Sequence, residues 1–308
     1  MLQPRSLALM TLPLAAALGL AGCGSSSGGS TAKAPATLSA AAPATGGATS
    51  AGSLADEVPA AIKSKGTLTV AADASYAPNE FIMPGQTAVV GMDADLAQAI
   101  GQQLGLRVTV VNAKFDAIIP GLAAGRYDLG MSSFTDTKER EKAVDFVTYF
   151  SAGTSFFTKA SGGTQVASLD ALCGVKVSVE TGTTQQTDAD DQSKKCTAAG
   201  KPAVDVLPFD DQSGANLALS SGRAQVSMAD SPVAAYQVKQ SNGAFALSGM
   251  PYGTAPYGIA IPKGKGMAKP VQDAVKALIA DGTYNKILTT WGVQAGAITD
   301  PAVDGATS

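Results

Sequence analysis

Polar side chains stand where several predicted strands end, in positions from which they could bind a charged ligand. Arg140 carries a planar guanidinium that can bind a carboxylate through two parallel hydrogen bonds. Ser133 and Thr135 alternate along a strand end, so both hydroxyls can face one side and donate to the same anion. Asp230 closes the segment AQVSMAD, and its carboxylate can accept a hydrogen bond from an ammonium group. These residue types predict a site with one cationic and one anionic side.

Two threonines extend this pattern. Thr183 and Thr184 follow the predicted strand VKVSV at 175–179, at the point where a loop opens a helix. Backbone N–H groups at such a helix N-terminus bind anions readily, so this segment is a further candidate for contact with a carboxylate.

A purely structural explanation competes at each position. Arg140 lies in the charged run 138–142, which is typical of a solvated helix face. Asp230 can be the N-cap of a helix that begins with Ser-Pro. Ser133 and Thr135 can be ordinary polar residues at the end of a strand. Taken one by one, the residues leave both interpretations open.

The composition excludes several classes of chemistry. The 308 residues contain no histidine, which excludes Ser-His-Asp and Cys-His catalytic arrangements and any histidine-ligated metal site. Three cysteines cannot form a closed four-cysteine zinc site. The formal net charge of −3 offers no basic surface for nucleic acid. We therefore expect no metal and no nucleic-acid partner, while a hydrophobic content of 45% predicts a folded core.

The N-terminus is typical of an exported chain. An apolar run at 7–22 comes after Arg5 and is too short for a confident membrane span, which favours a secretory signal peptide over residues 1–22. The sequence Leu20-Ala21-Gly22-Cys23 resembles the bacterial lipobox, so Cys23 is the predicted lipidation site; an ordinary signal peptide with an incidental cysteine is the alternative. Gly, Ser, Ala, Thr and Pro dominate the next segment, so residues 23–53 are predicted to be a lipid-anchored flexible linker.

Two further cysteines remain once Cys23 is lipidated. Outside the cytoplasm, an even pair such as Cys173 and Cys196 favours a disulfide. The alternative is a pair of reduced, buried thiols, because sequence spacing alone does not prove the geometry of a bridge.

Helix and strand periodicities alternate along the rest of the chain. Strands are predicted at 67–71, 107–113, 127–131, 175–179, 203–209 and 224–230. Helices are predicted at 93–104, 115–124, 214–221, 231–240 and 268–282. The extended, glycine-bearing segments 150–157 and 251–261 are typical of crossovers between two units. This alternation predicts an α/β fold with a largely parallel sheet.

Six stretches, in this order and spacing, resemble family 3 of the bacterial solute-binding proteins, the extracellular polar amino-acid-binding proteins of ABC importers. They are ADASYAP (72–78), VGMDADLAQAI (90–100), FDAIIPGLAAGRYDLGMSSFTDTKERE (115–141), ETGTTQ (180–185), SGRAQVSMADSPVAAY (221–236) and ADGTYNKI (280–287). The resemblance implies a type II-like periplasmic-binding-protein fold, in which two crossovers join two lobes around a ligand cleft. On this basis we expect lobe 1 at 54–153 and 254–308 and lobe 2 at 154–253.

The resemblance also implies roles for single residues. The positions that match the family's α-amino-acid site are Ser133, Thr135, Arg140, Thr183, Thr184 and Asp230. Tyr76 and Phe115 match positions that sandwich the ligand's side chain, although core packing is an alternative for Phe115. Asp73 and Glu180 match positions near the far end of the ligand, where two acidic groups would favour a cationic or donor-rich side chain. The alternative for both is a solvated loop carboxylate.

Two positions depart from the family pattern. Asn79 stands where the family commonly has an aromatic residue, and Met92 replaces the usual Phe. We expect both in or near the wall of the site, so the identity of the ligand's side chain does not follow from the resemblance.

The sequence thus predicts an extracytoplasmic binding lipoprotein, at the cell surface or in the periplasm, that captures a free polar or basic amino acid for an ABC importer. We expect a monomer that needs no cofactor, has no catalytic residues, contacts the membrane through its N-terminal lipid and delivers its ligand to an ABC transporter permease. Two alternatives stay open. One is a periplasmic dehydratase-like enzyme on the same fold, with Glu180 or Asp73 as general acid. The other is an amino-acid sensor without a transport role.

Overall fold

The computed structural model describes residues 53–307. The predicted signal peptide (1–22), the lipidation site Cys23 and all but the last residue of the predicted linker 23–53 lie outside the described residues. Within the described part of the chain, no helix is both long and apolar enough to cross a membrane.

The first lobe is built around the parallel strand β1 (Thr67–Ala72), which pairs with β5 (Arg107–Asn112) and β6 (Leu129–Gly130). Most of the side chains of β1 are buried, as expected for a parallel strand that is covered on both faces. The helices that cover or cap this lobe are α1 (Leu54–Glu57), α2 (Ala60–Lys65), α3 (Met92–Gln103), α4 (Phe115–Ala123), α8 (Ala268–Ala280) and α9 (Thr283–Trp291). A small sheet of β2 (Ser75–Tyr76), β3 (Glu80–Ile82) and β4 (Val89–Val90) lies at its edge.

The second lobe has its own parallel strands, β8 (Lys176–Glu180), β9 (Asp205–Phe209) and β10 (Val226–Asp230). Its helices are α5 (Thr184–Ala198), α6 (Gln212–Ser221) and α7 (Ser231–Gln240), together with short 3₁₀ turns at Leu169–Leu172 here and at Arg140–Lys142 and Gln294–Gly296 in the first lobe. Helix α6 begins before the predicted start at 214 because the Asp211 carboxylate accepts a hydrogen bond from the Gly214 amide at 2.7 Å and caps the helix.

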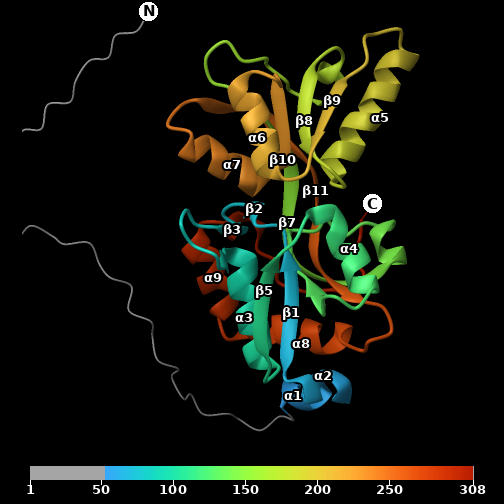
Figure 1. The fold of residues 1–308 in the computed structure, drawn as a ribbon, viewed down its shortest axis with the longest axis vertical. Helices are drawn as coiled ribbons and strands as arrows, with labels where there is room; N and C mark the ends of the chain where they lie inside the picture. The colour runs from blue at the N-terminus through green and yellow to red at the C-terminus, as the bar shows by residue number, and fades with distance from the viewer. Residues whose placement is uncertain (1–52, 308) are drawn as a thin grey trace, which may run out of the picture. The chain divides into compact units, whose positions relative to one another are not determined.

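Two long strands run through both lobes and join them (Figure 1). They are β7 (Val144–Lys159) and β11 (Phe245–Pro262), which pair antiparallel and contain the predicted crossovers. The sheet is therefore continuous, in the order β5-β1-β6-β11-β7-β10-β8-β9. The prediction of a largely parallel sheet is correct for the three outer strands on each side of the sheet. The central strands β11 and β7 are antiparallel to each other, because the chain enters the second lobe along β7 and returns to the first along β11. The predicted lobe boundaries at 153/154 and 253/254 fall inside β7 and β11 and stay a prediction.

The β7–β11 pair is irregular at its middle, between the two lobes. Its register shifts between Ser248 and Tyr252 and again between Tyr252 and Ala255. Gly153 faces this irregularity, and a Cβ atom at Gly153 would lie only 2.6 Å from the Tyr252 carbonyl oxygen. Glycine is therefore required for the close approach of the two connecting strands.

Strand β6 is shorter than the predicted strand 127–131. At Asp128 the amide donates to the Thr69 carbonyl at 2.9 Å, while the Thr69 amide donates to the Asp128 carboxylate at 2.6 Å, so a side chain supplies half of the pairing at this end. The chain leaves the sheet after Gly130 and carries Ser133 and Thr135 into the region between the lobes.

Each lobe has a buried apolar core. In the first lobe, four residues of the predicted amphipathic stripe of α8, Val271, Ala274, Val275 and Leu278, are buried in one cluster with side chains of β1 and α3. In the second lobe, a separate cluster surrounds β8 and β10 and includes Cys196. The predicted disulfide between Cys173 and Cys196 is present, with a Cα–Cα distance of 5.6 Å, and ties α5 to the segment before β8.

Replacing both Cys173 and Cys196 with serine is expected to lower the free energy of unfolding by about 3 kcal/mol, because the bridge restricts the unfolded chain. Urea unfolding measures this change. In the unreduced wild type, thiol titration after unfolding should find no free thiol from this pair. The titration is done in a Cys23→Ser background, so that any thiol detected comes from Cys173 or Cys196. Two reactive thiols in this variant would contradict the bridge.

Candidate functional site

A cleft lies between the two lobes. Eight of the ten predicted ligand-binding residues line this cleft. The full lining consists of Tyr76, Phe115, Ser133, Thr135, Arg140, Thr183, Thr184, Gln185, Gln212, Ala229, Asp230 and Val233. The predicted residues Asp73 and Glu180 do not line the cleft.

The guanidinium of Arg140 is the cationic group of this cleft. It lies over the rings of Phe115 and Phe134, with its central carbon 5.2 and 5.5 Å from the ring centroids. Two of its N–H donors are bound by backbone carbonyls, that of Thr135 at 2.9 Å in the first lobe and that of Gly182 at 2.9 Å in the second. Burial lowers the pKa of Arg140, but an arginine stays charged.

No carboxylate in the described part of the chain pairs with this charge. Within residues 53–307, Arg140 forms no salt bridge with any Asp or Glu. The guanidinium keeps donors that are not used by the two carbonyls and that can bind an external anion. The structural explanation for Arg140, a solvated helix face, is therefore wrong, because its side chain turns into the cleft.

Ser133 is fixed in the cleft wall by buried groups of the first lobe. Its backbone has a φ of +51°, a left-handed conformation, and its amide donates to Asp93 at 2.9 Å. Its hydroxyl accepts a hydrogen bond from the Asn79 amide at 2.9 Å and donates to Glu80 at 3.1 Å. Ser133 is thus held from behind by two carboxyl groups.

The Glu80 and Asp93 carboxyls have no cationic partner in the described residues, although both are fully buried. Burial raises the pKa of Glu80 and of Asp93, and the charge of Asp93 raises that of Glu80 further. The Tyr149 hydroxyl donates to both Asp93 oxygens at 2.8 Å, which offsets part of the cost of burying that group.

Asn79 and Met92 do not line the cleft, but Asn79 lies near its wall, as expected from the sequence. The Asn79 side chain lies behind Ser133, as its hydrogen bond shows. Met92 is fully buried in the core of the first lobe because α3 begins at this residue and turns its side chain inward. Their departure from the family pattern therefore affects the support of the site and not its surface.

Thr183 and Thr184 form the N-terminal end of α5. The Thr183 hydroxyl accepts a hydrogen bond from the Gln186 amide at 3.2 Å and donates to the Glu180 carbonyl at 2.7 Å. Both threonines line the cleft, so the positive end of the α5 dipole faces the space in front of Arg140.

Asp230 is the anionic group of the cleft. It precedes α7, yet its side chain makes no capping hydrogen bond, so the N-cap explanation is wrong for the carboxylate. Gln185 donates to one of its oxygens at 2.7 Å and the Tyr257 hydroxyl to the other at 2.6 Å. Burial raises the pKa of Asp230 to about 6.

Three contributing residues were not among the predicted site residues. Gln185 lies in the stretch ETGTTQ, directly after the two threonines, so its position offered a signal. Gln212 lines the cleft from the start of α6, and Tyr257 reaches Asp230 from β11. No local sequence motif marks Gln212 or Tyr257, because only the tertiary fold brings them to the site.

Two aromatic rings form one wall of the cleft. The centroids of Tyr76 and Phe115 are 5.9 Å apart at an interplanar angle of 54°. Phe115 also stacks on Phe134 at 4.4 Å and belongs to a buried cluster, so it serves both the core and the cleft. The Tyr76 hydroxyl is buried and has no hydrogen-bond partner in the described structure.

Asp73 and Glu180 are buried, so neither is a solvated loop carboxylate. Asp73 is 4% exposed and accepts hydrogen bonds from the Ser75 hydroxyl at 2.6 Å and the Phe115 amide at 3.1 Å. Glu180 is 1% exposed, and both of its carboxyl oxygens lack a partner among residues 53–307. Burial raises the pKa of Glu180 to about 10; the Asp73 charge adds to this rise, and the Tyr76 hydroxyl opposes it. Glu180 therefore lies beside Asp73 and the unpartnered Tyr76 hydroxyl.

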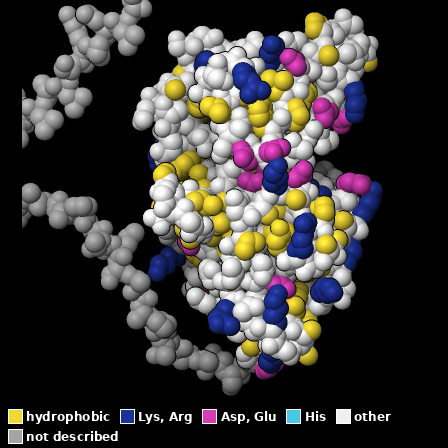
Figure 2. Space-filling view, viewed as in Figure 1, with side chains coloured by type: hydrophobic (Ala, Val, Ile, Leu, Met, Phe, Trp, Pro, Cys, Tyr) yellow, Lys and Arg dark blue, Asp and Glu magenta, His cyan; other side chains and the backbone are white. Residues whose placement is uncertain are grey.

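Acidic side chains gather where the lobes meet (Figure 2). A second hollow next to Ser75 is lined by Asp73, Asp210 and Asp211, with Lys114 as a single cation. Lys114 of the first lobe pairs with Asp210 of the second, and the Gln212 amide donates to the Ser75 hydroxyl at 3.1 Å. The lobes therefore touch each other along this edge. No group of three or more His, Cys, Asp or Glu side chains in the described residues could hold a metal ion.

Comparisons with known proteins match this geometry. The model of the bacterial extracellular solute-binding proteins, family 3, matches residues 68–294. The arginine-binding protein ArgT of Corynebacterium glutamicum is 32% identical over 248 residues, which cover 80% of this chain and 81% of ArgT. An ancestral arginine-binding protein bound to arginine is 37% identical with a TM-score of 0.67, over 73% of this chain and 98% of that one. The ancestral amino-acid-binding protein AncCDT-1, a precursor of cyclohexadienyl dehydratase, is 34% identical with a TM-score of 0.67, over 75% of this chain and 97% of its own.

Replacing Tyr149 with phenylalanine is expected to lower the free energy of unfolding by about 1–3 kcal/mol, because it removes the donor to a buried carboxylate. Urea unfolding at neutral pH measures the loss. Tyr236→Phe is the control, since the Tyr236 hydroxyl makes no hydrogen bond to another side chain or backbone group among residues 53–307. The loss should shrink at pH 5, where protonation of the Glu80–Asp93 pair reduces the buried charge. Equal losses of unfolding free energy at neutral pH and at pH 5 would contradict the conclusion that the Glu80–Asp93 pair carries a buried charge at neutral pH.

Proposed function

The chain belongs to family 3 of the bacterial extracellular solute-binding proteins, and we propose that it captures free L-arginine outside the cytoplasm for an ABC importer. The cleft between its lobes carries one cation, one anion and a pair of aromatic rings, which suits an amino acid. The proposal therefore has two parts: how the α-carbon groups are bound, and why the side chain is a guanidinium.

The α-carboxylate is assigned to Arg140 and the N-terminal end of α5. Arg140 has guanidinium donors left after its two carbonyl contacts, and it forms no salt bridge within residues 53–307. The Thr184 backbone is a further group on this side of the cleft, whereas the Ser133 hydroxyl already donates its proton to Glu80. The α-ammonium is assigned to Asp230, whose carboxylate Gln185 and Tyr257 hold in place. Each lobe thus supplies part of the site, and a bound zwitterion stabilises the closed arrangement.

The observation that carries the side-chain assignment is Glu180, which does not itself line the cleft but lies beside Tyr76, which does. A buried carboxyl without a hydrogen-bond partner is costly, and the Tyr76 hydroxyl beside it also lacks a partner in the described structure. A guanidinium offers five N–H donors in one plane and can satisfy several such oxygens together. The lysine ammonium has three donors at a single point and fits this spread of acceptors less well. The similarity to proteins named for arginine binding supports the same ligand.

An enzymatic role on the same fold is less well supported. A protonated Glu180 has the pKa of a possible general acid, and one structural neighbour is described as a dehydratase precursor. That neighbour is itself named an amino-acid-binding protein, and ArgT is named for binding. We therefore propose a binding protein, from which L-arginine should be recovered chemically unchanged.

Attachment to the membrane and oligomeric state are part of the same proposal. The lipobox-like segment ending at Cys23 supports a lipid anchor, and residues after it would tether the folded lobes to the membrane. A monomer is sufficient for function, because all the groups assigned to the ligand come from one chain.

Arg140→Ala and Asp230→Ala are each expected to weaken L-arginine binding by at least about a hundredfold, which is roughly 2.7 kcal/mol. Each change leaves one charged group of the ligand without its partner. Isothermal titration calorimetry measures the affinity, and urea unfolding of the ligand-free proteins should show little change. Arg126→Ala, which removes an exposed arginine of the same lobe, is the control. An Arg140→Ala protein that binds arginine within a few fold of wild type would falsify the carboxylate assignment.

L-arginine affinity is expected to rise as the pH increases from 7 to 8.5, by up to about tenfold per pH unit. The pKa of Glu180 is about 10 in the free protein, so the group is protonated at pH 7. A bound guanidinium favours the carboxylate, and binding must therefore release a proton. Asp230 contributes to this slope only near and below its pKa of about 6.

Calorimetry in two buffers of different ionisation enthalpy measures the released proton. Glu180→Gln should abolish the slope above pH 7 and weaken arginine binding, while the circular dichroism of the free protein stays unchanged. L-glutamine, whose side chain is uncharged, is the control ligand. If wild type binds arginine with no proton release at pH 7.5, Glu180 does not contact the guanidinium.

A further inference from the structure

The chain does not end where the family match ends. Residues 298–307, which we call the C-terminal tail, lie beyond the matched region 68–294. The tail returns to the first lobe and lies along β7. The Thr148 amide donates to the Ala302 carbonyl at 2.8 Å, and the Ala302 amide donates to the Thr148 hydroxyl at 2.8 Å. Val303 forms an antiparallel bridge with Val147.

A second pair of contacts fixes the tail one step further along. The Asp304 amide donates to the Phe146 carbonyl at 2.9 Å, and the Asp304 carboxylate accepts from the Phe146 amide at 2.8 Å. Asp304 has a φ of +51°, so the backbone turns there in a left-handed conformation. This turn directs the last described residues away from β7.

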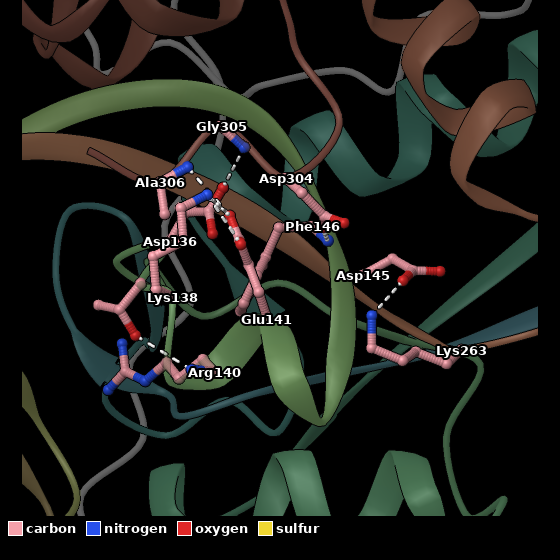
Figure 3. A network of polar contacts seen from close by, with 11 residues as sticks. Asp136, Lys138, Arg140, Glu141, Asp145, Phe146, Lys263, Asp304, Gly305 and Ala306 are labelled. Atoms are coloured by element: carbon pink, nitrogen blue, oxygen red, sulfur yellow. Dashed lines mark hydrogen bonds and ion pairs between the residues drawn. The ribbon is translucent and has the colours of Figure 1, made fainter. Parts of the chain in front are cut away.

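The residues after this turn contact both ends of the turn that carries Arg140 (Figure 3). The Gly305 amide donates to the Asp136 carboxylate at 2.8 Å, and the Ala306 amide donates to the Glu141 carboxylate at 3.1 Å. Asp136 directly follows Thr135, whose carbonyl holds the Arg140 guanidinium. Glu141 directly follows Arg140. The tail thus binds one residue on each side of the segment that presents the guanidinium to the cleft.

The fit between tail and lobe is close. Asp136 is 0% exposed, so its contact with Gly305 is a buried one. A Cβ atom at Gly305 would lie 2.8 Å from the Thr148 side chain, which only glycine avoids without a shift. A hydrogen bond to a buried carboxylate is stronger than one between neutral groups, so these two amides hold the turn firmly.

We propose that the C-terminal tail is a positioning element for Arg140, in which the Gly305 and Ala306 amides hold the 136–141 turn and thereby orient the guanidinium toward the ligand. Neither residue touches the cleft. The expected effect of the tail on ligand affinity rests on the proposed function of Arg140. Its expected effect on the rigidity of the 136–141 turn does not.

Two variants of the full chain test this role. Truncation after Asp304 removes both amide donors and keeps the pairing of Ala302 and Asp304 with β7. Gly305→Val keeps the chain length and displaces the tail through the clash with Thr148. Two controls leave the turn untouched: Thr307→Ala at the exposed end of the tail, and Lys263→Ala, which breaks the ion pair with Asp145 in the same region (Figure 3).

The first readout needs no ligand. Hydrogen–deuterium exchange in a peptide covering residues 137–143 is expected to accelerate in both variants and in neither control. Exchange in α5 of the other lobe should stay as in wild type. Unchanged exchange at 137–143 overturns the proposal. Faster exchange throughout the first lobe also overturns it, because the tail would then be a general part of the fold instead of a support for this turn.

The second readout is L-arginine affinity by calorimetry. Both variants are expected to bind roughly tenfold more weakly, a size usual for residues that act through a neighbour. In an Arg140→Lys background the same truncation should change the affinity less than about threefold, since the tail acts through the guanidinium. An equal loss in both backgrounds overturns the positioning role. If wild type itself does not bind arginine, the proposed function fails, and the exchange readout still decides the role of the tail.

Discussion

The structure depends on polar groups that are buried without a counter-charge. Arg140 is held in the cleft by two backbone carbonyls and two aromatic rings, none of which neutralises it. Glu180 is buried with no partner among the described residues, and its proton takes the place of a counter-charge. Placing such groups costs folding free energy, because a buried polar group loses its hydration. The rest of the fold supplies the rigid supports that keep them in place, and a ligand with opposite charges recovers part of that cost.

Each support comes from a different part of the chain. The Thr135 carbonyl belongs to the first lobe and the Gly182 carbonyl to the second, so the Arg140 side chain itself spans the cleft. Gly182 approaches the first lobe closely, since a Cβ atom there would lie 3.0 Å from the Asp116 side chain. The two lobes thus meet around the guanidinium, and the irregular centre of the β7–β11 pair, the only continuous connection between them in residues 53–307, is where their relative movement can be accommodated.

Much of this arrangement follows from local patterns. Strand ends converge at one edge of a parallel sheet, so residues that close strands, such as Asp230, could be assigned to a common site from the sequence. Helix α7 occupies the predicted residues 231–240 because Pro232 stands in its first turn and the helical pattern is unbroken. The resemblance to a family added the residues that have no local signature of binding, Arg140 above all.

Other features depend on packing that no local pattern encodes. The burial of Glu180 arises from the closure of two lobes around it. From the sequence alone, Glu180 could be either a ligand contact or a solvated loop carboxylate. The Glu80 and Asp93 carboxyls appear as ordinary polar residues in the chain, yet together they fix Ser133. Tyr257 reaches Asp230 from β11, and the crossovers are strands because β7 and β11 pair with each other over most of their length.

The path of the chain through the lobes also sets the order in which they can be completed during synthesis. The second lobe uses the contiguous elements from β8 to α7, together with the ends of β7 and β11. The first lobe needs β11, α8 and α9, which are among the last elements to be synthesised. Its strands β1, β5 and β6 pair with one another, but β6 also pairs with the distant strand β11, Gly130 with Ala260, and such a non-local pairing slows folding. The segment that carries Arg140 is therefore held in place only once β11 and the C-terminal tail have been synthesised, because both contact it.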